Sequence, residues 1–130
     1  MNMTTGTVRV GEPVVIPSRG PTGSFEVVFE DEGDTGYFYA LDPSLPAPIL
    51  DALHVYNVAQ VTDAASPLDL QIIWSADGNR AVLLLNRWPH AAFDFALRRG
   101  YCRTNFPPSS WSFSGHAWDD AVLAGLWPAA

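Results

Sequence analysis

The chain has 130 residues, of which 48% are hydrophobic and 12% aromatic, and its formal net charge at pH 7 is −7. This composition excludes a disordered chain and predicts a packed core in one domain spanning residues 1–130. The negative charge argues against general binding to DNA or RNA, because phosphates are held by clustered lysine and arginine. The longest apolar stretch is strand-sized and the first residues lack the features of a secretory signal, so we expect a cytoplasmic protein that does not enter a membrane.

Charge is divided unevenly along the chain. Ten carboxylates and no basic side chain lie between Arg19 and Arg80, whereas five of the seven arginines lie from Arg80 to Arg103. The acidic part could bind a basic surface on another protein through complementary charge. Alternatively, the arginines could pair with the acidic part of the same chain or of a second copy.

The first part of the chain predicts β-strands. Residues 1–23 are rich in Gly, Pro and Thr and contain β-like pieces at 7–10 and 13–16, which are typical of an edge strand or a loosely attached arm. β-branched and aromatic residues then form two runs, Phe25–Glu30 and Tyr37–Leu41, on either side of an acidic loop that contains glycine. This pattern predicts a hairpin.

The middle of the chain predicts one further strand and a second hairpin. Pro48–Leu53 is typical of a single helical turn, and the alternation over Leu53–Val61 predicts a strand. Leu70–Ser75 and Arg80–Leu85 flank an Asp-Gly pair, which favours a tight turn because both positions tolerate positive φ. Neither run alternates, so we expect both strands of this hairpin to be covered on two faces.

The segment Pro89–Gly100 has features of both a helix and a strand. A proline at its start and arginines near its end are helical features, but apolar residues recur at every second position from Ala91 to Leu97. We predict a hairpin that turns near Arg98–Gly100, with a helix as the alternative.

A helix is predicted near the C-terminus. Ser114 can cap it, Trp118, Val122 and Leu126 share one of its faces, and Pro128 ends it. Together the elements predict an α+β, mainly β, fold: a strongly bent antiparallel β-meander with one C-terminal helix, similar in outline to a partly open Sm-like or SH3-like barrel. The tryptophan-rich region around this helix could close the open face of the sheet or anchor a partner.

Cys102 is the candidate nucleophile, since flanking arginines can lower a thiol pKa. A cysteine catalyst needs a base, and His90 with Asp94 would complete a Cys-His-Asp set. Four residues of strand, however, separate His90 from Asp94 by roughly 13 Å, and a lone cysteine in a strand is typically a buried apolar residue. The sequence contains no convergent catalytic set and therefore favours a protein that is not an enzyme.

An arginine-rich segment is the second candidate site. Guanidinium forks and aromatic stacking could hold a small anion near Arg98, Arg99, Tyr101 and Arg103. The candidate ligand-binding residues are His90, Asp94, Arg98, Arg99, Tyr101, Cys102 and Arg103. The acidic loop at 31–36 lacks the ligand spacing of a calcium loop, and the chain has neither a Gly-rich phosphate loop nor a paired-cysteine motif. We therefore assign no metal and no cofactor.

Several segments resemble an uncharacterised family of small bacterial proteins. They are Glu30–Asp42, His54–Val58, Trp74–Gly78, Pro89–Phe95 and Gly100–Pro107. The resemblance covers about residues 25–107 and implies a bacterial, cytoplasmic protein, but it transfers no activity.

The leading functional hypothesis is a non-catalytic interaction protein of immunity or adaptor type, which binds a basic partner protein through its acidic surface. The alternatives are a binder of a small anionic ligand at the arginine-rich segment and an enzyme that uses Cys102 and His90. An exposed strand edge or the tryptophan-bearing region also predicts a homodimer.

Overall fold

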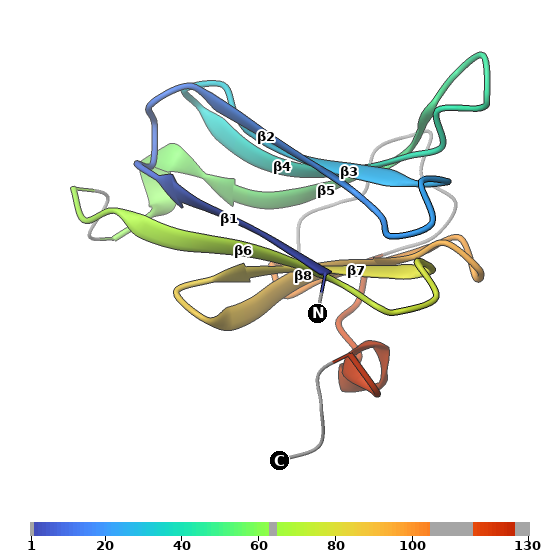
Figure 1. The fold of residues 1–130 in the computed structure, drawn as a ribbon. Helices are drawn as coiled ribbons and strands as arrows, with labels where there is room; N and C mark the ends of the chain where they lie inside the picture. Colours follow the sequence, from blue (N-terminus) through green and yellow to red (C-terminus); the bar gives the residue numbers. More distant parts are fainter. Residues whose placement is uncertain (1, 63–64, 105–115, 127–130) are drawn as a thin grey trace.

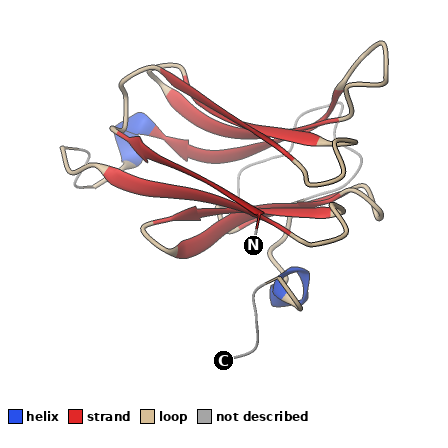
Figure 2. Ribbon diagram, viewed as in Figure 1, coloured by secondary structure: helices blue, strands red, loops and turns tan. Residues whose placement is uncertain are grey.

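The computed structural model describes residues 2–62, 65–104 and 116–126. In these ranges the chain is mainly β, with nine strands and two short 3₁₀ helices arranged as two antiparallel sheets that face each other (Figures 1 and 2). The elements are β1 (Asn2–Val8), β2 (Val14–Arg19), β3 (Glu26–Asp31), β4 (Thr35–Leu41), β5 (Ile49–Asn57), η1 (Val58–Gln60), β6 (Leu68–Trp74), β7 (Arg80–Leu85), β8 (Trp88–Asp94), β9 (Arg99–Cys102) and η2 (Asp120–Leu123). Within the described ranges, no helix has the length and apolar character needed to cross a membrane.

The two sheets are built from different parts of the chain. One has the strand order β1-β6-β7-β8-β9 and the other β2-β3-β4-β5. The chain therefore starts in the five-stranded sheet, forms the whole four-stranded sheet, and returns to pair β6 with β1, where Val8 lies opposite Leu68. The predicted single bent meander, partly closed into a barrel, is wrong. The β5–β6 connection crosses between the layers, because each sheet buries one apolar face against the other.

The main core lies between the sheets. Its largest fully buried side chains include Phe29 and Phe38 from the four-stranded sheet and Trp74 and Phe93 from the five-stranded sheet. In β3 and β4, buried residues alternate with half-buried ones. This alternation follows from the pleat, since only one face of that sheet packs on the core.

Strand β7 is buried along all of Ala81–Leu85, which confirms for this strand the prediction of cover on two faces. For its partner β6 the prediction is wrong in the first half of the strand, where Asp69 is exposed and Gln71 half-buried. The odd-numbered residues of β7 belong to the core between the sheets. Val82 and Leu84 point to the other side, where they form a second apolar cluster with Val122 and Leu126. The C-terminal segment, residues 116–126, thus covers the outer face of the five-stranded sheet.

The predicted C-terminal α-helix is not found in the described residues, so the fold there is mainly β rather than α+β. The segment instead forms the single turn η2. The Asp119 carboxylate accepts a hydrogen bond from the Ala121 amide at 2.9 Å at its start, and Gly125, with φ of 73°, bends the chain after it. Sheet contacts and this glycine override the helical periodicity. The predicted cap Ser114 and the terminating Pro128 lie outside the described residues.

The predicted hairpins are present as β3–β4, β6–β7 and β8–β9. The β6–β7 turn places Gly78 at φ of 75°, as an Asp-Gly pair favours. Strands β8 and β9 exclude the helical alternative for Pro89–Gly100. The helical turn predicted over Pro48–Leu53 is wrong, because β5 already begins at Ile49 and pairs there with Leu41 of β4.

Residues 2–19 supply two strands, β1 paired with β6 and β2 paired with β3. The side chains of Thr4 and Ser18 are hydrogen-bonded at 2.7 Å. Ser18 Oγ also accepts a hydrogen bond from the buried Trp74 Nε1 at 2.9 Å. The segment predicted as an edge strand or arm therefore forms one edge strand in each sheet.

Candidate functional site

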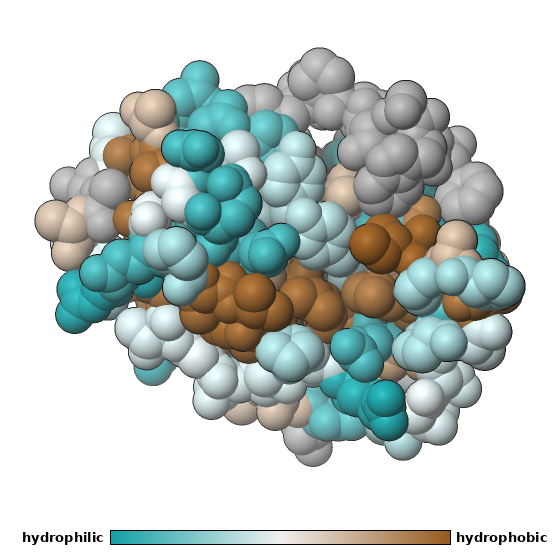
Figure 3. Space-filling view, turned by 90° about the horizontal axis from the view of Figure 1, so that it is seen from above, coloured by the Kyte–Doolittle hydropathy of each residue, from teal (hydrophilic) through white to brown (hydrophobic). Residues whose placement is uncertain are grey.

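The first candidate site is the outer face of the four-stranded sheet. Alternation along β2–β5 directs one set of side chains away from the core, and we call this set the tyrosine face: Val15, Pro17, Val28, Glu30, Tyr37, Tyr39 and His54. The strand register aligns them in two rows, one of Val15, Glu30, Tyr37 and His54, the other of Pro17, Val28 and Tyr39. Figure 3 looks onto this sheet and shows apolar residues beside polar ones.

Aromatic rings stack along the tyrosine face. The ring centroid of Tyr37 lies 5.7 Å from that of Tyr39 and 4.7 Å from that of His54. Burial and the neighbouring Glu30 carboxylate raise the pKa of Tyr39, so its hydroxyl remains protonated at neutral pH. Stacked tyrosines have few rotatable bonds and an apolar ring with a polar tip, which suits them to anchor a protein partner.

Acidic side chains lie at both ends of the tyrosine face. In the β3–β4 turn, hydrogen bonds from Thr35 lower the pKa of Glu32. Beyond β4, hydrogen bonds from Ser44 lower the pKa of Asp42. Both carboxylates therefore stay ionised well into the acidic pH range. The one arginine in the strands of this sheet, Arg19, is already within 3.8 Å of a glutamate carboxylate, so the face is negative.

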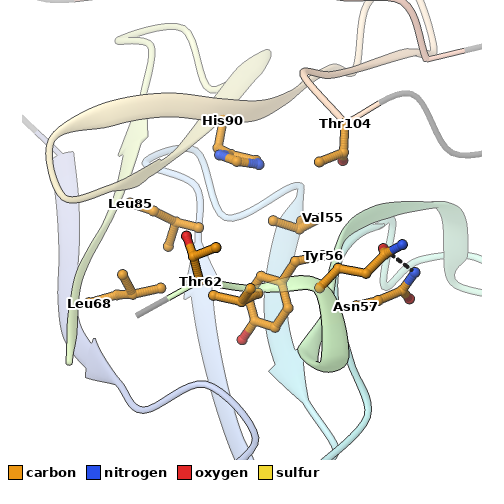
Figure 4. Close-up of a pocket in the computed structure, with 10 residues that line it drawn as sticks. Val55, Tyr56, Asn57, Thr62, Leu68, Leu85, His90 and Thr104 are labelled. Atoms are coloured by element: carbon orange, nitrogen blue, oxygen red, sulfur yellow. Dashed lines mark hydrogen bonds between the residues drawn. The ribbon is translucent and has the colours of Figure 1, made fainter. Parts of the chain in front are cut away.

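The second candidate site is a cavity of about 360 Å³ between the two sheets. It lies where the end of β5 and η1 meet the start of β6, the end of β7 and the start of β8 (Figure 4). The apolar lining residues are Val55, Tyr56, Val61, Leu68 and Leu85, and the polar ones are Asn57, Gln60, Thr62, His90 and Thr104. The two kinds of residue are equal in number, but most of the exposed wall is apolar, and an apolar wall with some polar groups is typical of a small-molecule site.

His90 enters the cavity from a β-bulge. The register between β7 and β8 shifts at this point, with Ala91 opposite Leu83 and Pro89 opposite Leu84, so His90 is the extra residue. A bulge of this kind redirects a side chain that regular pairing would orient otherwise. The His90 side chain then points toward the cavity and toward Thr104 (Figure 4).

The imidazole of His90 has a lowered pKa, and one of its nitrogens has no hydrogen-bond partner among the described residues. Burial lowers its pKa, a hydrogen bond to the backbone of Val55 partly opposes this, and the Arg103 charge lowers it further. Its Nε2 atom is buried and finds no hydrogen-bond partner among the described residues. Buried polar atoms are nearly always hydrogen-bonded, so this nitrogen is an exception within the described part of the chain.

A buried carboxylate holds one wall of the cavity in place. The Tyr56 hydroxyl donates to Asp31 Oδ2 at 2.6 Å, and the amides of Gly11 and Gly33 donate to the same carboxylate at 2.7 and 2.8 Å. The Tyr56 ring packs over Gly36, where an added Cβ would come within 2.6 Å of the ring. The acidic loop at 31–36 thus has an internal structural role through Asp31.

Cys102, the candidate nucleophile, is buried in the core. Its thiol lies 3.5 Å from the His54 carbonyl and 3.0 Å from Thr104 Oγ1, and burial raises its pKa. Within the described part of the chain, these partners are a backbone carbonyl and a hydroxyl, and neither is a histidine ring. Asp94, at the far end of β8 from His90, accepts a hydrogen bond from the Leu97 amide at 3.0 Å. The structure therefore does not bring the Cys-His-Asp set together.

Arg103 packs between two tryptophan rings instead of facing an open anion site. Its guanidinium carbon lies 4.6 Å from the ring centroid of Trp88 and 4.2 Å from that of Trp118. Its Nε donates to the Pro89 carbonyl, and a terminal nitrogen lies 3.5 Å from the Asp120 carboxylate. These contacts fasten the C-terminal segment to the five-stranded sheet.

The other arginine-segment residues are spread along β9 and its turn. Arg99 lies over the Tyr101 ring at 5.0 Å, and Arg98 adopts a turn conformation with φ of 53°. Four residues of extended chain separate Arg99 from Arg103, roughly 13 Å, so these side chains do not converge on one point. Arg80 donates to the Val122 carbonyl at 3.0 Å, so it also contacts the C-terminal segment.

Sequence reasoning missed a buried pair between β5 and the C-terminal segment. His116 Nε2 lies 3.0 Å from Asp51 Oδ2, and both side chains are buried. Gly100 lies beside them, where an added Cβ would meet Leu53 at 2.5 Å and Asp51 at 3.0 Å. The cavity was missed as well, because a single histidine in an ambiguous segment does not reveal a bulge or an unpaired nitrogen.

Comparisons with known proteins identify the family to which the chain belongs. A protein of Haemophilus influenzae named "Uncharacterized protein" is 50% identical over 84 residues, which are 64% of this chain and 52% of that protein. The chain thus spans about half the length of this curated relative. No solved structure matches the chain. Residues 8–127 match the model of a family described as "Uncharacterized protein conserved in bacteria (DUF2251)". The match covers most of the chain and confirms the resemblance found in its sequence, and the chain therefore belongs to this bacterial family.

Proposed function

We propose that this protein is a non-catalytic binding protein of adaptor or immunity type, which docks its tyrosine face against a basic surface of another protein. The supporting observation is that stacked tyrosines lie next to a glutamate carboxylate on the outer face of the four-stranded sheet. No described segment covers that face in the way that residues 116–126 cover the opposite one.

The tyrosine face combines the two features that such docking needs. Tyr37 and Tyr39 provide large rings of the type enriched at the energetic centres of protein interfaces. Glu30 lies opposite Tyr37 in the register, with Glu32 and Asp42 near the two ends. Carboxylates around an aromatic centre accelerate association with a basic protein and select against acidic ones.

A capture experiment tests this function. In the first step, three immobilised proteins are exposed to bacterial extract: the wild type, Tyr39→Ala and Glu30→Lys. In the second step, any protein that is retained is purified, and its affinity for each of the three is measured. Asp69→Asn is the matched control, because it removes a carboxylate from the exposed part of the other sheet. We expect Tyr39→Ala and Glu30→Lys each to weaken binding at least about 10-fold, and Asp69→Asn to leave it unchanged.

Salt provides the second readout. Binding should weaken markedly between about 50 and 500 mM salt, because charges at an exposed interface are screened. Retention that is equal for wild type and Glu30→Lys, or insensitive to salt, would contradict the proposal.

Two further expectations accompany this proposal. We expect the protein to act in the cytoplasm and to form a homodimer, for which the sheets offer edge strands at β1, β2, β5 and β9. Light scattering over a range of concentrations checks the second expectation, and a monomer throughout would refute it.

A further inference from the structure

We propose that the cavity between β5, η1 and β8 binds a small, mainly apolar molecule carrying an uncharged hydroxyl group, which donates a hydrogen bond to Nε2 of His90. This binding site is separate from the tyrosine face, and the proposal does not depend on the protein-docking function.

The cavity is large enough for a ligand and too apolar for ordered water alone. Its volume of about 360 Å³ lies in the range of small-molecule pockets and exceeds that of one liquid water about 12-fold. Val61, directly after η1, supplies an apolar wall together with Leu68 of β6 and Leu85 of β7. A water at His90 would find few further partners on such walls, whereas buried waters typically make about three hydrogen bonds.

The state of His90 determines which chemical group fits. The hydrogen bond to the backbone of Val55 favours the protonated form of the ring, as expected when a ring N–H donates to a carbonyl. In the neutral imidazole the other nitrogen then carries a lone pair and accepts. Nε2 is the nitrogen without a partner among the described residues, so the group it requires is a donor.

A hydroxyl fits better than an anion. A carboxylate could bind Nε2 only if the ring were protonated, and both burial and the Arg103 charge disfavour that form. A neutral hydroxyl requires no change of protonation. The remaining surface of the ligand would pack on the apolar walls, with burial as the main driving force.

The polar rim of the cavity is already organised. The side-chain oxygen of Asn57 accepts a hydrogen bond from His54 Nε2 at 2.7 Å. The side-chain nitrogen of Asn57 donates to the Gln60 side-chain oxygen at 2.9 Å, and this second bond is the dashed line at Asn57 in Figure 4. The Thr104 hydroxyl donates to the His54 carbonyl at 2.7 Å. Asn57, Gln60 and Thr104 thus already have partners, and among the buried side-chain nitrogens and oxygens of the described residues His90 Nε2 has none, so it is the atom that we expect to select the ligand's polar group. A preorganised site of this kind loses little entropy on binding.

Two matched probes test the proposal by NMR. The probe 4-methylphenol carries the hydroxyl, and 4-methylanisole has the same ring without a donor. We expect 4-methylphenol to shift the ring ¹⁵N resonance of His90 and the amide resonances of Leu68 and Leu85. It should bind at least about 5-fold more tightly than the ether, as one buried hydrogen bond implies.

Variants locate the binding. His90→Phe keeps a ring but removes the acceptor, so the two probes should bind it equally. Val61→Trp fills the cavity and should abolish binding of both, while the same substitution at the exposed Val15, outside the cavity, should leave binding intact.

Three results would overturn the proposal: equal affinity of the two probes for the wild type, no movement of cavity resonances up to the solubility limit, or unchanged binding to Val61→Trp. If His90→Phe does not fold, the comparison of phenol and ether on the wild type decides. Salt-sensitive protein capture is measured separately, so this site can fail while the tyrosine face is upheld, or the reverse.

Discussion

The outer faces of the two sheets differ in composition and in what covers them. On the five-stranded sheet, Val82 and Leu84 are buried beneath Val122 and Leu126 of the C-terminal segment. On the four-stranded sheet, the residues of the tyrosine face are two tyrosines, a histidine, a glutamate, two valines and a proline, and they are half-buried or exposed. The first face is a second core, whereas no described segment covers the second in this way. This difference separates a face that stabilises the fold from the face for which we propose a role in recognition.

Introducing a charge on each face should show the largest contrast. Val82→Asp places a carboxylate in the cluster under the C-terminal segment, where Val82 is fully buried. We expect it to lower the free energy of unfolding by at least about 3 kcal/mol. Val28→Asp makes the same change on the tyrosine face and should cost about 1 kcal/mol, mainly through strand propensity. Urea unfolding followed by circular dichroism measures both, and equal losses would refute the distinction between the faces.

Removing the contact that fastens the C-terminal segment to the five-stranded sheet should lower the free energy of unfolding by an intermediate amount. Arg103→Ala removes a guanidinium that stacks on Trp88 and Trp118, and a cation–π contact of a partly exposed side chain contributes about 1 kcal/mol. We expect a loss near 2 kcal/mol and faster hydrogen exchange at the Leu126 amide, which donates within this segment. Arg98→Ala, in an exposed turn, is the matched control and should change stability by less than about 0.5 kcal/mol. Similar exchange rates in both variants would show that Arg103 does not hold the segment.

The contrast between the faces could be partly anticipated from the sequence. The unbroken apolar run Ala81–Leu85 predicted a strand covered on two sides, which is confirmed. The run Tyr37–Leu41 predicted one strand of a hairpin, and the structure adds that this strand is buried on one side only. The tryptophan-rich C-terminus was predicted as a helix, but its periodic residues reach the sheet from one turn and an extended chain. Periodicity identified which residues are buried, and packing against the sheet determined the backbone conformation.

The candidate sites were less accessible to sequence reasoning. The arginine-rich segment suggested an anion site, yet Arg103 is held by Trp88 and Trp118, rings that are 15 residues before it and 15 after it in the chain. The sequence suggests His90 as a possible base for Cys102, whereas in the structure its Nε2 lies in a cavity without a hydrogen-bond partner among the described residues. Both depend on a bulge and on long-range packing, for which a single sequence carries no local signal.

The titration of the tyrosines should show the smallest difference between the two outer faces, but it tests that difference at single residues. Burial raises the pKa of both Tyr39 and Tyr101, on the open and the covered face respectively, but only at Tyr39 does Glu30 contribute. Because the folded-state pKa is raised, each phenol stabilises the fold below the unfolded pKa of about 10. That stability is lost as the pH rises through the folded-state value.

The variant Glu30→Gln separates the two tyrosines. It should lower the pKa of Tyr39 toward its ordinary value and leave that of Tyr101 unchanged, as followed by absorbance near 295 nm in Tyr39→Phe and Tyr101→Phe backgrounds. A parallel shift of both would mean that Glu30 acts through the general charge of the protein and not through a local contact. The net charge of the protein would affect the pKa of both tyrosines, whereas a direct contact affects only the neighbouring one. A shift confined to Tyr39 would therefore establish that the Glu30 carboxylate interacts directly with the Tyr39 phenol. A basic partner that binds Glu30 should then lower the pKa of Tyr39 in the same way.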